Sequence, residues 1–169
     1  GFDLHCGGQD LRFPHHENER AQAVALGREF ARHWMHNGFV VDAEGEKMSK
    51  SLGNVSNLLD LIEAFDARAY RMVLLQSHYR SPVSISADGL EGAGRALAGL
   101  DAFGRRAEGL DAVDPDDGVI ERFRSAMDDD LDTPTAMALV FDTVRRANVA
   151  LDAGDAASSG PLASAVAAM

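Results

Sequence analysis

Both lysines of this chain lie in one short stretch, GEKMSKSLGN, where Lys47 and Lys50 are three positions apart. A lysine ammonium is a compact charge on a flexible stem, which suits a clamp on phosphate groups. Gly53 would let the backbone approach such a ligand closely. Two ammonium groups beside a triphosphate would stabilise the charge on a departing pyrophosphate. The same residues also suit a solvated basic turn before a helix, so their charge alone leaves both interpretations open.

The stretch FPHHENE holds a second candidate, because His15 and Glu19 are four positions apart. A helix would place both side chains on one face, and imidazole with carboxylate suits Zn²⁺. Two ligands do not make a metal site, however. Glu17 and Glu19 are equally suited to a helix start, where they interact favourably with the helix dipole. His16 would face elsewhere, either into a core or toward a substrate.

A third candidate is HCGGQD, in which two glycines follow a predicted strand. Gly7 and Gly8 permit close approach of the backbone to a ligand, and Asp10 could accept hydrogen bonds from ribose hydroxyls. The alternative is a tight turn in which the glycines adopt positive φ. Cys6, the only thiol, could form a cluster with His5, or it could be a small buried residue.

The elements that must position these side chains are predicted to be strands and helices up to about residue 55, and helices alone afterwards. A strand precedes the glycines, and a helix follows with Pro14 in its first turn and its end near Gly27. Further along, Ala69, Met72 and Val73, with Leu75 or Gln76, are expected on one helical face. This order predicts an α/β piece joined to an all-α bundle.

The acidic stretch DAVDPDDG is the strongest linker candidate in the second half of the chain. After it, two more helices are expected, and Thr133 is predicted to cap the second with Pro134 in its first turn.

The net charge of −11 is unevenly spread along the 169 residues. Residues 1–80 carry nine Lys or Arg against eleven Asp or Glu, whereas residues 81–169 carry seven against sixteen. An acidic second half is a poor general surface for nucleic acid, because phosphate binding depends on Lys and Arg. Any contact with RNA must therefore come from local patches or from parts outside this chain.

Composition excludes several protein classes. A hydrophobic content of 46% provides for a real core, and no apolar run is long enough for a membrane span. We expect no signal peptide, and a single Cys fits a reducing compartment. The chain opens within a predicted strand and closes within a predicted helix, so we expect it to be a piece of a longer, cytoplasmic protein.

Four ordered motifs carry a resemblance to a known family: FDLHCGGQDLRFPHHENERAQA, FARHWMHNGFV, GEKMSKSLGN and LLQSHYRSP. KMSKS is the signature of class I aminoacyl-tRNA synthetases, and the set closely resembles the cysteinyl-tRNA synthetases. AMDDDLDTPTAMALVFD is similar to the helical tRNA-contact region of that family. The resemblance implies the C-terminal part of a Rossmann-like catalytic domain (1–55), a helical stem-contact or connector region (56–112) and a truncated DALR-like helical tRNA-binding domain (113–169).

By the same resemblance, we expect a cysteine–tRNA ligase that acts as a monomer. It would convert L-cysteine and ATP, with Mg²⁺, to cysteinyl-adenylate and pass the cysteinyl group to tRNA(Cys). One Zn²⁺ per chain would bind the substrate thiolate, which excludes serine because zinc prefers sulfur. Two of its ligands fall on His15 and Glu19, and two cysteines of the family lie upstream of this chain. We expect no adenylation by residues 1–169 alone.

The resemblance also assigns the remaining site residues. The adenylate site would be lined by Gly7, Gly8 and Asp10, and Val40 or Val41 would flank the adenine. Lys50 would contact ATP and Lys47 would assist it. His5 and His16 would belong to the cysteine pocket, whereas Trp34 is expected to pack rather than to react.

Two alternatives stay open. The mycothiol-pathway cysteine:glucosaminyl-inositol ligase is similar to the synthetase but transfers cysteine to an amino sugar. That family has Arg after the signature, where this chain has Leu52, and HYRSP and AMDDDLDTP also favour the synthetase. The other alternative is a non-catalytic helical module with a vestigial nucleotide site, against which the intact KMSKS argues.

Overall fold

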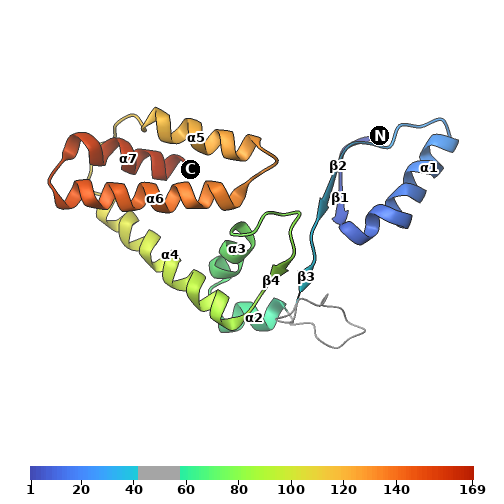
Figure 1. Cartoon of the computed structure of the whole chain (residues 1–169), viewed down its shortest axis with the longest axis horizontal. Coiled ribbons are helices and arrows are strands. Elements are labelled where there is room, and N and C mark those ends of the chain that lie inside the picture. Colours follow the sequence, from blue (N-terminus) through green and yellow to red (C-terminus); the bar gives the residue numbers. More distant parts are fainter. Residues whose placement is uncertain (42–57) are drawn as a thin grey trace. The chain divides into compact units, whose positions relative to one another are not determined.

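The computed structural model describes residues 1–41 and 58–169 (Figure 1). They divide into two compact units. Of the described residues, unit 1 comprises 1–41 and Tyr79–Ser86, and unit 2 comprises 58–78 and Ala87–Met169. The described strands lie in unit 1 and the long helices in unit 2, which confirms an α/β piece followed by an all-α bundle.

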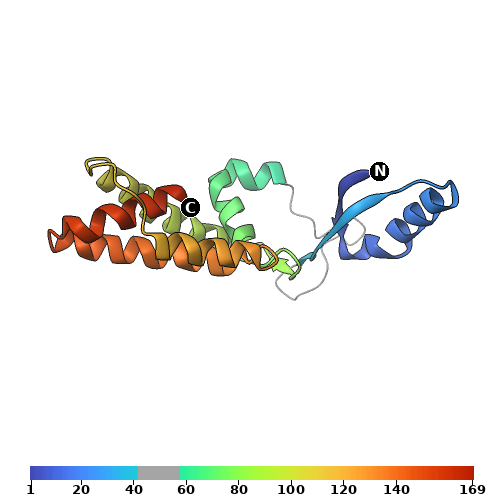
Figure 2. The same cartoon turned by 90° about the horizontal axis from the view of Figure 1, so that it is seen from above.

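Unit 1 is built around a parallel pair of strands, β1 (Phe2–Gly8) and β2 (Ala31–Asn37). Parallel strands need a crossover connection, and here a helix provides it (Figure 2). The register places His5 opposite Trp34 and Gly7 opposite His36. Three helical segments make up the crossover: η1 (Gln9–Leu11), the π-helical turn η2 (Arg12–His16) and α1 (Glu17–Ala25).

The helix predicted from Pro14 to Gly27 is shorter than expected. Pro14 lies in η2, where the Phe13 backbone is extended (φ −142°, ψ 133°), and α1 begins only at Glu17. The predicted end is close to correct, because Gly27 adopts a φ of +67° just after the helix. Such a conformation suits glycine, which carries no Cβ.

A second parallel pair joins β3 (Val40–Val41) to β4 (Val83–Ser84). The prediction of helices alone after residue 55 is therefore wrong at β4, because two residues are too short to show an alternating pattern. The backbone at Gly38 lies close to the segment that precedes β4, because the Gly38 N–H donates to the Tyr79 carbonyl at 2.7 Å. A Cβ at position 38 would lie only 2.2 Å from the carbonyl oxygen of Ser81.

The regular elements described in unit 2 are all helices, and in both views α6 and α7 lie side by side (Figures 1 and 2). Its main core cluster is formed by apolar side chains from α4 to α7, including Phe103, Val119 and Leu162. As predicted, Ala69, Met72 and Val73 are buried on one face of α3. The further prediction of Leu75 or Gln76 on that face is wrong, because both are exposed. The helices are α2 (Leu58–Ala64), α3 (Ala67–Leu75), α4 (Ala87–Ala107), α5 (Asp117–Asp128), α6 (Thr133–Asp152) and α7 (Ala156–Ala168).

Aspartates begin several of these helices, which accounts for part of the acidity of the second half. The side chains of Asp116, Asp132 and Asp155 each accept a hydrogen bond from a backbone N–H three residues on. Thr133 is therefore not the cap of α6, as predicted; it is the first helical residue. Asp132 precedes it and reaches the N–H of Thr135 at 3.1 Å, the geometry of an N-cap.

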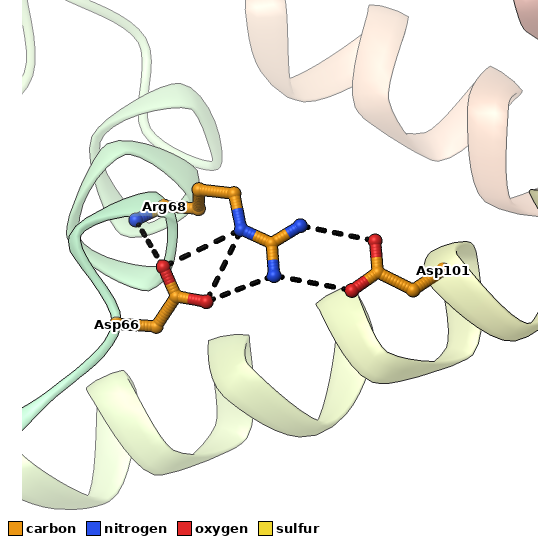
Figure 3. Close-up of polar contacts among 3 residues, drawn as sticks. All are labelled: Asp66, Arg68 and Asp101. Atoms are coloured by element: carbon orange, nitrogen blue, oxygen red, sulfur yellow. Dashed lines mark hydrogen bonds and ion pairs between the residues drawn. The ribbon is translucent and has the colours of Figure 1, made fainter.

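One charged network ties α3 to α4 within unit 2 (Figure 3). The Arg68 guanidinium donates to Asp101 at 3.0 and 3.1 Å and to Asp66 at 2.9 and 3.1 Å. Asp66 also caps α3 through the Arg68 N–H at 2.8 Å. Hydrogen bonds from Arg68 lower the pKa of both carboxyl groups. Because two guanidinium nitrogens of Arg68 bind the two carboxylate oxygens of Asp101, this contact fixes the start of α3 against α4.

Among the helices described, none is both long enough and apolar enough to cross a membrane.

Candidate active site

The side chains that could do chemistry in unit 1 gather on one face of the β1–β2 pair. His5 and Trp34 are paired across the strands, and Gly7 is paired with His36. Residues i and i+2 of a strand point to the same face, so His5, Trp34 and His36 share it. After β1 the chain turns through η1 and η2 and delivers His16 to the same face.

His16 is the centre of this cluster. It is buried, with 4% of its surface exposed, and its Nδ1 lies 2.8 Å from the Nε2 of His36. Its ring contacts those of His5 and Trp34 edge-on or tilted, with centroids 4.5 and 5.3 Å away. Burial, followed by the neighbouring imidazoles His5 and His36, lowers the pKa of His16. The neutral ring can therefore offer one nitrogen as an acceptor at neutral pH.

Gly7 makes room for that ring. A Cβ at position 7 would lie 2.8 Å from Cε1 and 3.0 Å from Nε2 of His16. A side chain at this point would push His16 away from β1, so the absence of a side chain at Gly7 allows the imidazole to pack there. At Gly8 a Cβ would meet Oδ1 of Asp10 at 2.6 Å, which puts the exposed Asp10 carboxylate against the same turn.

Glu19 is flanked by two histidines. Its Oε2 lies 2.9 Å from Nε2 of His5, and its Oε1 lies 3.6 Å from Nε2 of His15. Two zinc ligands at about 2.1 Å from a metal with tetrahedral angles are about 3.4 Å apart, so the His15–Glu19 separation fits a shared ion. The 2.9 Å contact with His5 is instead a hydrogen-bond distance.

Ligand atoms of His5, His16 and Glu19 also lie within 4.8 Å of one another. The pair predicted from spacing, His15 and Glu19, is thus joined by the two histidines that were expected in the substrate pocket. Cys6 does not belong to this group: it is exposed, so the expectation of a small buried residue is wrong. Strand alternation explains this, because Cys6 and His5 point to opposite faces.

A hollow of about 620 Å³ lies beside the cluster. Its lining includes His16 and several residues for which the sequence motifs predicted no role in a pocket. It is lined by Gln9, Arg12, His16, Glu17, Arg20, Trp34, His36 and Arg80. Trp34 therefore packs within the histidine cluster, as expected, and also forms part of the hollow's wall.

The family model of the class I (C) tRNA synthetase catalytic domain matches residues 1–95, more than half of the chain. The chain belongs to the class I tRNA synthetases. A second model, the DALR domain, matches residues 122–169 of this synthetase chain.

Curated relatives of this synthetase chain are cysteine–tRNA ligases. The chain is 46% identical to that of Geobacter sulfurreducens over 168 residues, which cover 91% of the chain and 35% of the relative. It is 49% identical to that of Aromatoleum aromaticum, covering 92% and 34%, and 47% identical to that of Kocuria rhizophila, covering 99% and 35%. The chain therefore spans about a third of the length of the curated relatives it matches.

Two solved structures share the fold. One is the LeuRS of Agrobacterium radiobacter K84 in a ternary complex with tRNA and LeuAMS, with a TM-score of 0.74 and 22% identity. It covers 97% of this chain and 24% of the LeuRS chain. The other is methionyl-tRNA synthetase of Mycobacterium tuberculosis bound by methionyl-adenylate, with a TM-score of 0.65, 20% identity and coverage of 97% and 38%.

The remaining predicted site residues of this synthetase chain lie apart from the hollow or outside the described part. Val40, on β3, is 37% exposed and is not among the residues that line the hollow. Lys47 and Lys50 lie outside the described residues, so their roles stay predictions.

Sequence reasoning missed His36, and it gave Trp34 no part in a pocket. Both lie on β2, two positions apart, and the alternation in HWMH places them on one face. The missing information was the pairing of β1 with β2, which only the tertiary structure provides. Arg80 gave no signal either, because it reaches unit 1 from a segment distant in sequence.

Proposed function

We propose that the complete protein containing this chain is a cysteine–tRNA ligase. It activates L-cysteine with ATP and Mg²⁺ to cysteinyl-adenylate and transfers the cysteinyl group to tRNA(Cys). The observation that carries the proposal is the position of Glu19, held by His5 on one oxygen and facing His15 at 3.6 Å on the other. This arrangement lies in a class I synthetase catalytic domain whose curated relatives are cysteine–tRNA ligases.

His15 and Glu19 are proposed to supply two ligands of one Zn²⁺ per chain. Their donor set and separation suit that ion, and bound zinc would accept the substrate's thiolate in preference to a hydroxyl. His5 would orient the Glu19 carboxylate through the 2.9 Å hydrogen bond. His5 and His16 would form the wall of the cysteine pocket.

The nucleotide half of the site follows the same proposal. Gly7, Gly8, Asp10 and Val40 would line the adenylate site. The cysteine carboxylate attacks the α-phosphate of ATP, the bond to pyrophosphate breaks, and a ribose hydroxyl of the terminal tRNA adenosine then displaces AMP. The chain's residues would act by positioning and charge stabilisation.

The lysines would act on the leaving group. Lys50 would contact the phosphates of ATP and Lys47 would assist. We expect Lys50→Ala to slow adenylate formation by about a hundredfold with little change in cysteine affinity. A collapse of cysteine affinity with unchanged turnover would remove Lys50 from this role.

We also propose three functional regions. Residues 1–55 form the end of the catalytic domain, and residues 56–112 form a connector that contacts the tRNA stem. Residues 113–169 form a DALR-like tRNA-binding region. We also propose that the protein is monomeric and cytoplasmic.

The test is a pair of assays on the complete protein. Cysteine-dependent exchange of pyrophosphate into ATP measures activation, and incorporation of labelled cysteine into tRNA measures transfer. The proposal expects both. Activation without transfer to tRNA, but with transfer to glucosaminyl-inositol, would reassign the protein to the amino-sugar ligases. Absence of activation would refute the proposed function.

A further inference from the structure

Three arginines in the wall of the hollow have no part in the function proposed above. Arg12 begins η2, Arg20 lies on α1, and Arg80 lies in the segment Tyr79–Ser86 that belongs to unit 1. Arg80 is held in place by its backbone, because the Gln9 side-chain amide donates to its carbonyl at 3.0 Å. The three side chains therefore come from three separate elements and face one space.

The charge of this wall is opposite to that of the chain. Among the described residues that line the hollow, Glu17 is the one carboxylate, against three guanidinium groups. It lies 3.4 Å from Arg20, but both side chains are more than half exposed, so this pair holds Arg20 only weakly. The chain as a whole has a net charge of −11. The surplus positive charge of this wall nevertheless attracts anions locally.

The same wall carries flat rings. Trp34 and His36 are stacked, with an interplanar angle of 11° and centroids 6.1 Å apart. The Arg80 guanidinium also lies over the Tyr79 ring at 5.1 Å. Single-stranded RNA is recognised by this combination: arginines take its phosphates, and aromatic or guanidinium planes stack on its bases.

We propose that Arg12, Arg20 and Arg80 bind the phosphates of the single-stranded 3′ end of the tRNA and guide it across the hollow. This inference rests on the proposed function. The phosphates of ATP are assigned there to the lysine pair, which leaves the arginines for a second phosphate ligand. Guanidinium groups spread over three elements suit a run of backbone phosphates better than one compact triphosphate.

The test uses the complete protein with the double substitution Arg12→Ala and Arg80→Ala. The matched control is Arg32→Ala, which removes an exposed arginine on β2 that pairs with Asp3 at 3.2 Å outside the hollow. Two quantities are measured: cysteine-dependent pyrophosphate exchange, and single-turnover transfer of cysteine to tRNA over a series of salt concentrations.

We expect the double variant to reduce the rate of single-turnover transfer at subsaturating tRNA by about a hundredfold, or about tenfold for each lost phosphate contact. Because fewer counterions are released on binding, its transfer should also depend less steeply on salt. Pyrophosphate exchange should stay at the wild-type level, which shows in addition that the variant is folded. Arg32→Ala should match the wild type in every assay.

Two results would overturn the inference while leaving the proposed function intact. In one, exchange falls as much as transfer, which would mean that the arginines bind ATP. In the other, transfer and its salt dependence match those of Arg32→Ala. A wild-type protein that fails to activate cysteine at all would instead refute the proposed function, and this inference with it.

Discussion

The two units of the molecule use their interiors differently. Among the described residues, every buried hydrophobic side chain belongs to unit 2, from Ala69 to Ala165. In the described part of unit 1 the only buried side chain is that of His16. Unit 2 is thus stabilised by apolar packing, whereas unit 1 packs imidazoles and an indole around a polar hollow.

This difference separates stability from chemistry. A hydrophobic core stabilises a fold by removing apolar surface from water, and the buried apolar side chains of unit 2 do this. Unit 1 places its polar side chains at close distances, where they can bind a metal or a substrate. Substitutions in the two units should therefore be detected by different measurements.

The largest effect on stability should come from Phe103→Ala, which empties part of the unit 2 core. Phe103 is only 4% exposed, so truncation should reduce the free energy of unfolding by about 3–5 kcal/mol and Tm by about 10 °C. Thermal unfolding followed by helical circular dichroism of residues 1–169 measures this. The control is Phe13→Ala in unit 1, where the ring is 76% exposed. Equal losses for the two variants would break the comparison.

Gly7→Ala should damage the site more than the fold. Its Cβ would lie within 3.0 Å of the His16 ring, and a shift of the imidazole by about 1 Å can reduce activity by about a hundredfold. Cysteine-dependent pyrophosphate exchange by the complete protein should fall accordingly, while the helical unfolding transition of unit 2 stays in place. Wild-type exchange in this variant would show that His16 does not need its position against β1.

The network of Arg68 predicts the pH dependence of unit 2. Hydrogen bonds to Arg68 hold the pKa of Asp66 and of Asp101 below the ordinary value of 3.8. A depressed pKa stabilises the fold fully above 3.8, and this stabilisation is lost as the pH falls through the folded-state values. Arg68→Met should therefore lower stability at neutral pH, and its difference from the wild type should shrink in acid.

Urea unfolding at neutral pH and at a pH well below 3.8 checks this prediction. Arg145→Met is the control, because it removes an exposed pair with Asp142 inside one helix, α6. It should cost less than Arg68→Met, which loses the connection between α3 and α4. A difference from the wild type that grows in acid would contradict the assignment of the network.

The smallest effect expected is a gain in stability. Gly99 lies on the exposed side of α4, and a Cβ there would meet nothing within 4 Å. Gly99→Ala should raise the free energy of unfolding by about 0.5–1 kcal/mol, because alanine loses less backbone entropy in a helix. The measurement is urea unfolding of residues 1–169. The same substitution would thus help in unit 2 and harm at Gly7 in unit 1.

Local sequence patterns were sufficient to predict part of the fold and of the site. The apolar spacing predicted the buried face of α3, and the four-residue spacing of His15 and Glu19 predicted that they face each other. Thr133 was the predicted cap of α6, but the adjacent Asp132 can accept the same bond, and in the structure Asp132 is the cap. Short-range rules identify such candidates but do not choose between adjacent ones.

The rest of the site depends on contacts between distant segments. His36 reaches His16 only because β2 pairs with β1 in one register. Arg80 joins the hollow because Tyr79–Ser86 returns to unit 1 and places β4 beside β3. Two-residue strands have no periodicity to detect, and the register of a pair is not encoded in either strand alone.

The most direct test of the account is the zinc content of the complete protein and of three variants. His15→Ala and Glu19→Ala remove the proposed ligands, whereas His33→Ala removes an exposed histidine that pairs with Leu4, one position along β2 from Trp34 and therefore on the other face. We predict about one zinc per chain in the wild type and in His33→Ala, and at least about a tenfold loss of zinc affinity in the other two. Full zinc content in His15→Ala and Glu19→Ala would contradict the central claim that unit 1 carries part of a metal site.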